Sequence, residues 1–216
     1  MSESRAFWDK RADKHAAAPI KDEAAYGHTL ERTRSHLDAR HRVLELGCGT
    51  GTTALKLVDR VASITGTDIA PGMIRIARAK AEADNVPNVQ FHTATVAEAL
   101  ALGEAPDVVL AFNLLHLLPE MQGDLRAIYA RLPPGGLLIS KTPCVADPAM
   151  GLLRFVLGPV LPVMRLVGMA PFVQRLDFRL LDGVITGAGF DIVETGCFPA
   201  ISRYVVARKP AGAEHS

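Results

Sequence analysis

One short segment near position 45 constrains the fold of this chain more than any other. The apolar run at residues 42–47 has the character of a buried strand, and a helical pattern follows Gly51. Gly47, Gly49 and Gly51 lie at this change, where residues without a Cβ atom let the backbone turn sharply and approach a ligand closely. The first helical turn then presents free N–H groups. The segment predicts either a ligand-binding turn or an ordinary glycine-rich connection.

The spacing of these glycines and of the next acid limits which classes of ligand this turn could bind. The pattern G-x-G-x-G is neither the dinucleotide fingerprint G-x-G-x-x-G nor a P-loop, which requires GK[ST]. Asp68 closes the next predicted strand, 21 residues after Gly47. In a doubly wound fold a carboxylate at this place binds the hydroxyls of a ribose. A helix N-cap is the other interpretation of Asp68, and both roles are compatible.

Strand and helix patterns alternate along most of the chain. Such alternation is typical of a parallel, doubly wound sheet with helices on both faces. Two helices are expected before the glycine segment, and two closing strands, antiparallel to each other, at the end. The expected helices are 5–18, 22–38, 71–84, 121–132 and 180–189, and the further strands are 61–68, 88–94, 106–113, 137–142, 190–199 and 202–210.

The composition excludes several classes of protein. The 24 basic and 23 acidic residues nearly balance, so no basic excess is available for general nucleic-acid binding. The three cysteines are far apart and form no CxxC pair, which argues against a metal site and favours the reducing cytosol. We expect no signal peptide and no membrane-spanning helix. The mean hydropathy of +0.17 nevertheless indicates some apolar excess.

Together these motifs resemble the class I S-adenosylmethionine-dependent methyltransferases, in particular the quinone-biosynthesis C-methyltransferases and bacterial phospholipid N-methyltransferases. The resemblance runs from about Val43 to Thr142. It rests on the segments at 43–51, 67–73, 106–116 and 132–136. It implies a Rossmann-like, seven-stranded, mostly parallel sheet with a reversed last strand. The whole chain, 1–216, would be one domain, with an N-terminal helical cap (1–40), a cofactor-binding core (41–144), a lid (145–178) and a closing helix and strands (179–210).

The same resemblance implies S-adenosylmethionine as the cofactor and assigns residues to it. Its methionine part would be held by the segment that ends the first strand, and Asp68 would bind the ribose. Ile69 and Met73 would flank the adenine. The family usually has a Gly-Asp pair after the third strand, but Ala94 and Thr95 stand here, so Thr95 and the Val96 backbone are expected to contact the adenine. The residues expected to hold the methionine part of the cofactor are Glu45, Gly47, Cys48, Gly49 and Gly51.

The candidate catalytic residues follow the fourth strand or lie on an N-terminal helix. Asn113 is expected to orient a polar nucleophile and to contact the cofactor. His116 has the intrinsic pKa of a general base, although a packed structural role is the competing interpretation. Tyr26 lies on the helix that covers the cofactor in similar proteins. Lys141, at the end of the fifth strand, is expected to be a surface or edge residue.

The segment 145–178 is the most individual part of the chain. It is rich in apolar residues and arginine and contains prolines that break a long helix, so two short helices with a bend are expected. It is either a lid or a basic, apolar cap at the inner face of the membrane. We therefore expect a methyl acceptor that is hydrophobic or amphiphilic, such as a phospholipid headgroup or a quinone precursor. The alternatives are a soluble amine, thiol or hydroxyl metabolite, and a non-catalytic cofactor-binding module.

Overall fold

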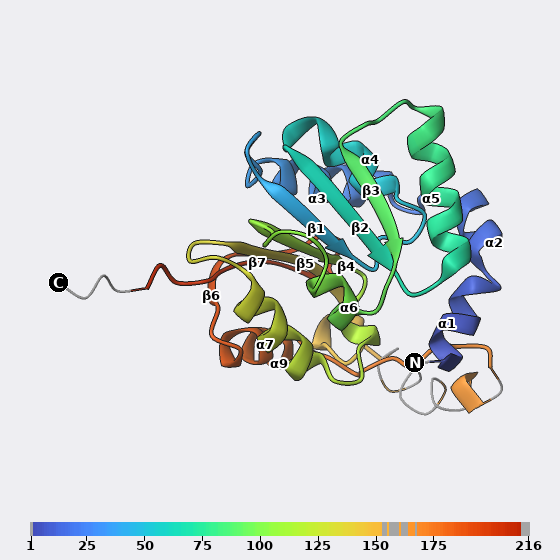
Figure 1. The fold of residues 1–216 in the computed structure, drawn as a ribbon. Helices are drawn as coiled ribbons and strands as arrows, with labels where there is room; N and C mark the ends of the chain where they lie inside the picture. Colours follow the sequence, from blue (N-terminus) through green and yellow to red (C-terminus); the bar gives the residue numbers. More distant parts are fainter. Residues whose placement is uncertain (1, 153–154, 156–159, 161–163, 167, 213–216) are drawn as a thin grey trace.

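The structure is a computed structural model, and it describes residues 2–152, 155, 160, 164–166 and 168–212. Seven strands form one sheet in the order β3-β2-β1-β4-β5-β7-β6 (Figure 1). Strands β1 to β5 pair in parallel, and β7 runs antiparallel to both β5 and β6. The predicted mostly parallel sheet with a reversed last strand is therefore confirmed. The strands are β1 (Arg42–Leu46), β2 (Ser63–Asp68), β3 (Val89–Thr93), β4 (Val108–Phe112), β5 (Leu137–Pro143), β6 (Asp191–Cys197) and β7 (Ser202–Arg208).

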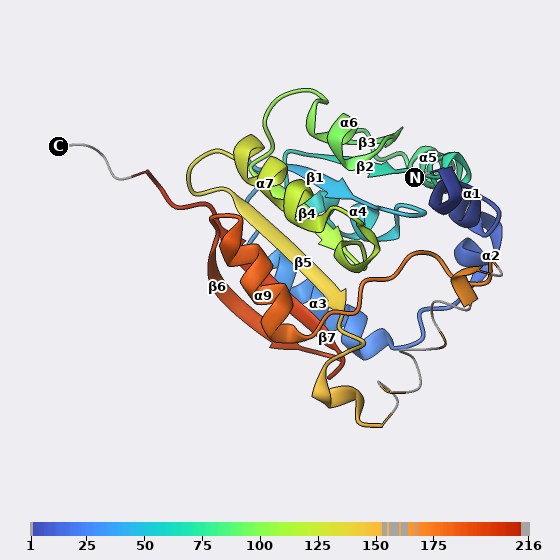
Figure 2. The same cartoon turned by 90° about the horizontal axis from the view of Figure 1, so that it is seen from below.

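Helices cover both faces of the sheet because side chains alternate between the faces along each strand. One buried cluster lies under α6, α7 and α9, and the other lies under α4 and α5, with Leu30 of α3 packed against it (Figure 2). The helices are α1 (Ser2–Asp9), α2 (Ala12–Ala17), α3 (Glu23–Arg34), α4 (Thr52–Leu57), α5 (Pro71–Ala83), α6 (Val96–Leu100), α7 (Met121–Arg131) and α9 (Phe178–Gly187). Short 3₁₀ turns are η1 (Val58–Arg60), η2 (Leu115–Leu117) and η3 (Pro148–Met150).

The N-terminal segment departs from the expected single helix at 5–18, because the chain forms α1 and α2 with a break between them. Both short helices pack on the start of α5. Asp9 accepts a hydrogen bond of 2.6 Å from the backbone N–H of Gly72, and Asp13 pairs with Arg75 at 2.8 Å. A Cβ atom at Gly72 would lie 3.0 Å from the Cβ of Ala12. The close approach of α2 therefore favours a glycine at position 72.

Helix α6 was not expected from the sequence. Thr95 is its N-cap, and its hydroxyl accepts from the Glu98 N–H while the Glu98 carboxylate accepts from the Thr95 N–H. This capping box satisfies two backbone donors that a helix of five residues would otherwise leave free. The turn after β3 is consequently ordered by its own side chains.

The segment 145–178 leaves the carboxyl end of β5 and returns along η2. Gln174 donates its N–H to the His116 carbonyl at 2.7 Å and its side-chain amide to the Leu118 carbonyl at 2.6 Å. Residues 164–166 are helical and lie near α1 in Figures 1 and 2. The expected pair of bent helices falls mostly on residues outside those described. Among the described residues, none of the helices is long and apolar enough to cross a membrane.

Candidate cofactor and methyl-acceptor site

The three glycines form the tight turn between β1 and α4, at the point where the strand order reverses between β1 and β4. All three have positive φ angles, +65°, +53° and +75° for Gly47, Gly49 and Gly51. A Cβ atom at Gly51 would lie 2.7 Å from Phe91, so this glycine serves the packing of the core. A Cβ atom at Gly49 would meet only His15, at 3.8 Å. Gly49 is therefore the glycine whose surroundings leave room for a ligand.

Cys48 lies within the same turn, but its side chain points into the core. The side chain is 8% exposed and packs in the cluster under α4 and α5, against Gly66. Burial raises the pKa of this thiol well above its ordinary value. Only the backbone of Cys48 is thus available to the predicted cofactor.

Glu45 is a buried acid at the end of β1 that lacks a complete set of partners. The residue is 3% exposed, and its buried Oε2 atom has no hydrogen-bond partner among the described residues. Burial raises its pKa to about 8, with a hydrogen bond from the Ala54 N–H acting in the opposite direction. A buried carboxyl with a free oxygen fits a ligand that brings an N–H donor or a positive charge, such as the ammonium of a methionine group.

Asp68 lies at the end of β2 with both carboxylate oxygens bound to backbone. Oδ2 accepts from the Gly49 N–H at 3.1 Å, and Oδ1 accepts from the Ala70 N–H at 2.9 Å. Ala70, not Asp68, is the N-cap residue of α5. Burial raises the pKa of Asp68, and the two backbone hydrogen bonds oppose this shift. The acid therefore fixes the glycine turn, and each of its oxygens retains a lone pair for a ribose hydroxyl.

The residues predicted around the adenine differ in their accessibility. Met73 is buried with Ala12 and Ala70 beneath the N-terminal helices, whereas Ile69 is half-buried at the turn. The Thr95 hydroxyl already donates to the Glu98 carboxylate and accepts from its N–H. Val96, at the first position of α6, is half-buried. Their contacts with adenine stay predictions.

Asn113 and His116 lie in the loop that follows β4. Asn113 is exposed in the left-handed region, with φ of +54°, and its backbone N–H donates to the Lys141 carbonyl at 2.7 Å. A Cβ atom at Gly47 would lie 2.9 Å from Leu114, so this loop touches the glycine turn. His116 is largely buried, its Nδ1 has no hydrogen-bond partner in the part of the chain that the structure describes, and burial lowers its pKa to about 4. The imidazole is thus neutral at pH 7, and its role as a base stays a prediction.

Helix α3 brings Tyr26 to the same region and contacts Lys141 of β5. The Tyr26 hydroxyl lies 3.2 Å from the Thr53 hydroxyl of α4, and Glu45 is among the groups that raise its pKa, after burial. Lys141 corrects the sequence prediction, because it is half-buried and donates to the Thr29 hydroxyl at 2.9 Å. It is neither a surface nor an edge residue, since α3 packs across the end of β5.

Sequence reasoning also missed His15, which lies on α2 above the glycine turn. Its ring carbon Cε1 is the atom nearest to a Cβ built at Gly49, and its charge acts on Asp68. The contacts of Asp9 with Gly72 and of Asp13 with Arg75 hold α1 and α2 in this position. No local pattern around His15 signals this placement, because it results from docking on α5.

Comparisons with known proteins agree with this geometry. A family model described as a methyltransferase domain matches residues 16–195. The chain is 33% identical over 125 residues to the ubiquinone biosynthesis O-methyltransferase of Methylobacterium sp. (strain 4-46), covering 58% of this chain and 50% of that protein. It is 34% identical over 171 residues to the trans-aconitate 2-methyltransferase of Methylobacterium nodulans, covering 74% and 64%. The chain thus spans half to two thirds of these curated relatives.

The fold also matches solved structures. Magnesium protoporphyrin IX methyltransferase from Synechocystis PCC 6803, solved with bound SAH, superposes with a TM-score of 0.73 at 18% identity, over 95% of this chain and 97% of that chain. The free oxygen of Glu45 and the open turn at Gly49 fit the methionine part of such a cofactor. The chain therefore belongs to the methyltransferase domain family, as a class I domain whose cofactor is S-adenosylmethionine.

Proposed function

We infer that this protein methylates a hydrophobic or amphiphilic small molecule, such as a quinone precursor or a phospholipid headgroup, at an anionic membrane surface. The observation that carries the proposal is the exposure of apolar side chains in the segment 145–178. Leu152, Leu166 and Met169 are 82%, 87% and 62% exposed. Isolated exposed apolar residues are ordinary, but several within one segment next to a site indicate contact with an apolar phase or ligand.

The charges of the same segment favour an anionic surface. Asp147 and Asp177 are its only acids, and both accept hydrogen bonds from backbone N–H groups within the segment or at the start of α9. Arg165 and Arg175 are exposed. Basic residues beside exposed apolar side chains are the combination that binds membranes containing anionic lipids.

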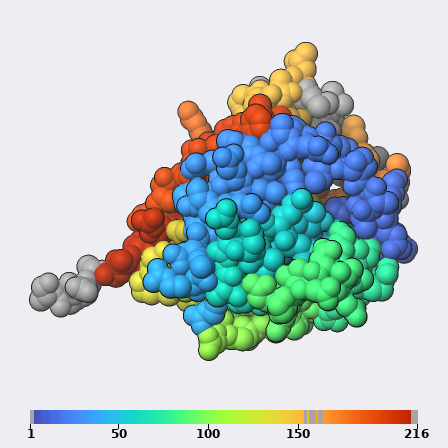
Figure 3. All heavy atoms as spheres, turned by 90° about the horizontal axis from the view of Figure 1, so that it is seen from above, coloured from blue at the N-terminus to red at the C-terminus, as the bar shows by residue number. Residues whose placement is uncertain are grey.

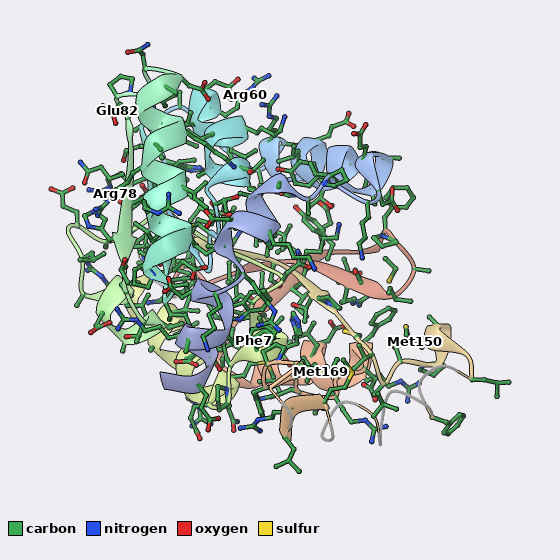
Figure 4. All side chains as sticks on the ribbon, turned by 90° about the vertical axis from the view of Figure 1, so that its right-hand side faces the viewer. Phe7, Arg60, Arg78, Glu82, Met150 and Met169 are labelled. Carbon is green, nitrogen blue, oxygen red and sulfur yellow. The ribbon has the colours of Figure 1, made fainter. Side chains whose placement is uncertain are left out.

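The segment also lies at the correct end of the molecule for an acceptor. Figure 4 shows Met150 and Met169 at the same end as Phe7 of α1, opposite Arg60 and Glu82. In Figure 3 the yellow and orange atoms of the segment extend beyond α3. Because parallel strands present their carboxyl ends to ligands, an acceptor delivered by this segment would meet the ends of β4 and β5.

The chain's own residues position the reactants for this transfer. When bound, S-adenosylmethionine would supply a sulfonium methyl group to a nucleophile that attacks the methyl carbon in line with the C–S bond, and S-adenosylhomocysteine would be the leaving group. Glu45 would hold the methionine part of the cofactor and Asp68 its ribose, and the exposed Asn113 carboxamide orients the acceptor. His116, neutral at pH 7 and without a partner at Nδ1, accepts the proton of an acceptor that begins protonated.

Vesicle flotation tests the membrane part of the proposal. We expect the protein to float with vesicles of phosphatidylcholine and phosphatidylglycerol, but not with phosphatidylcholine alone. Leu166→Glu combined with Met169→Glu should abolish flotation, because it places two anions in the exposed apolar segment. The matched control is Val193→Glu, which changes an exposed apolar residue of β6. Flotation that is unaffected by the double substitution would refute this surface.

Release of S-adenosylhomocysteine tests the catalytic part. Quinol precursors and phospholipids presented in the same vesicles should be methylated faster than the same headgroups without acyl chains. A similarity to the trans-aconitate 2-methyltransferase favours a second candidate, a soluble metabolite, for which 145–178 is only a lid. Preference for the water-soluble panel would select that candidate. Cofactor binding by calorimetry without turnover of either panel would select a non-catalytic module.

A further inference from the structure

We propose that Lys141 binds an acidic group of the methyl acceptor, so that the protein selects acceptors carrying a negatively charged oxygen. The proposal rests on the inferred methyl transfer to an amphiphilic small molecule, and it specifies the polar part of that molecule. The geometry that carries it is a half-buried ammonium group with spare donors at the carboxyl end of β5, beside Asn113.

The hydrogen bonds around Lys141 orient its ammonium group without satisfying it. Nζ donates to the Thr29 hydroxyl at 2.9 Å. That hydroxyl in turn donates to the Ala25 carbonyl at 2.8 Å, so its proton is committed and only a lone pair faces the lysine. An ammonium has three N–H donors. Among the described residues, Thr29 is the one hydrogen-bond acceptor for Nζ, which leaves two donors for a ligand.

Lys141 also forms no ion pair with any residue in the described part of the chain. Arg32 and Arg203 form ion pairs with Glu194 and Asp182, at 2.6 Å and 2.5 Å, but Lys141 forms none within 4.0 Å of an acid that the structure describes. Asp22 is the acid whose charge acts on Lys141, and its side chain caps the first turn of α3. Burial lowers the pKa of Lys141. Placing a cation there without a partner has a free-energy cost that an anionic ligand removes.

The position of Lys141 matches the place where an acceptor must approach. Its carbonyl accepts from the Asn113 N–H, and in the sheet it is the register partner of Phe112. On α3, Tyr26 and Thr29 are three residues apart and share one face of the helix. The same helix thus contacts the Glu45 side of the site through Tyr26 and the Lys141 side through Thr29. An acidic group held at Lys141 lies between α3 and the ends of β4 and β5.

Calorimetric binding of matched probes tests this role. Octanoate and octanamide share an apolar chain and differ in charge, and each is titrated into the protein saturated with S-adenosylhomocysteine. We expect wild type to bind octanoate about tenfold or more tightly than octanamide, the preference of a charged hydrogen-bonded pair. Lys141→Met should abolish this preference while leaving octanamide binding unchanged, and Lys141→Arg should restore it. The control is Lys56→Met, on the exposed face of α4.

Two further results separate this proposal from a structural role and from the proposed function. In wild type labelled with ¹³C at the lysine ε position, the Lys141 resonance should shift with octanoate and not with octanamide. This measurement is made on wild type and therefore does not depend on the folding of a variant. A preference for octanoate that survives in Lys141→Met, or an absence of preference in wild type, overturns the proposal. If the preference depends on Lys141 but no amphiphilic acceptor is methylated, the anion site stands and the proposed function fails.

Discussion

Replacing Glu45 with glutamine should make the protein without cofactor more stable at neutral pH. The carboxyl group is buried at the end of β1 with Oε2 unpartnered, and burial raises its pKa from 4.5 to about 8. Between these two values the folded chain holds a proton that the unfolded chain has released. Stability therefore falls as pH rises through this window, by about 1.4 kcal/mol for each pH unit. From pH 5.5 to 7.5 the Glu45 contribution falls by about 2–3 kcal/mol.

Urea unfolding of wild type and Glu45→Gln at both pH values isolates this effect. Every other group titrates in both proteins, so the difference between them reports Glu45 alone. We expect the variant to gain about 2–3 kcal/mol relative to wild type on going from pH 5.5 to 7.5. Parallel pH curves for the two proteins would refute the assignment of a protonated, buried Glu45.

Glu45→Gln, which should stabilise the protein without cofactor, should be unfavourable for cofactor binding. A ligand ammonium pairs with the ionised carboxylate, so binding at pH 7 should release up to one proton from Glu45 in wild type and none from the variant. Calorimetry in buffers of different ionisation enthalpy measures this release. The glutamine variant should also bind S-adenosylhomocysteine more weakly, because an amide pairs less strongly with an ammonium. Equal proton release in both proteins would show that a group other than Glu45 releases the proton.

Three further substitutions test other parts of the site. Asp68→Ala should weaken S-adenosylhomocysteine binding by about 1–3 kcal/mol, the loss of a charged acceptor; unchanged affinity in a titration would refute the ribose assignment. Gly51→Ala should destabilise the fold more than Gly49→Ala, because both positions have a positive φ but only the Cβ at Gly51 would also lie 2.7 Å from Phe91. Gly49→Ala should in addition weaken cofactor binding; thermal melts that rank the two variants otherwise would contradict this. Between pH 7 and pH 4.5, His116→Phe should lose about 2 kcal/mol less unfolding free energy than wild type. The reason is that the folded-state pKa of His116 is about 4, so the stability of wild type falls as the pH drops below 6.5. Urea unfolding of both proteins at the two pH values checks this.

The sheet and the glycine turn were predictable because their signals are local. The strands are short apolar runs whose side chains face helices on both sides, and each glycine of the turn has a positive φ angle. Helix α6 also had a local signal that was overlooked, since Thr95 and Glu98 have the spacing of a capping box. Its five residues are too few for an amphipathic pattern to be recognised.

The remaining errors concern contacts between residues far apart in the chain. The break between α1 and α2 has no glycine or proline in the sequence, and it allows both helices to follow the start of α5. Lys141 and Thr29 are 112 positions apart, and only the crossing of α3 over β5 brings them together. A lysine at a strand end has the same local pattern whether it is solvated or covered. Whether such a lysine can bind an anion depends on which helix covers it and on which acids already form ion pairs with other basic residues. Both depend on the tertiary packing.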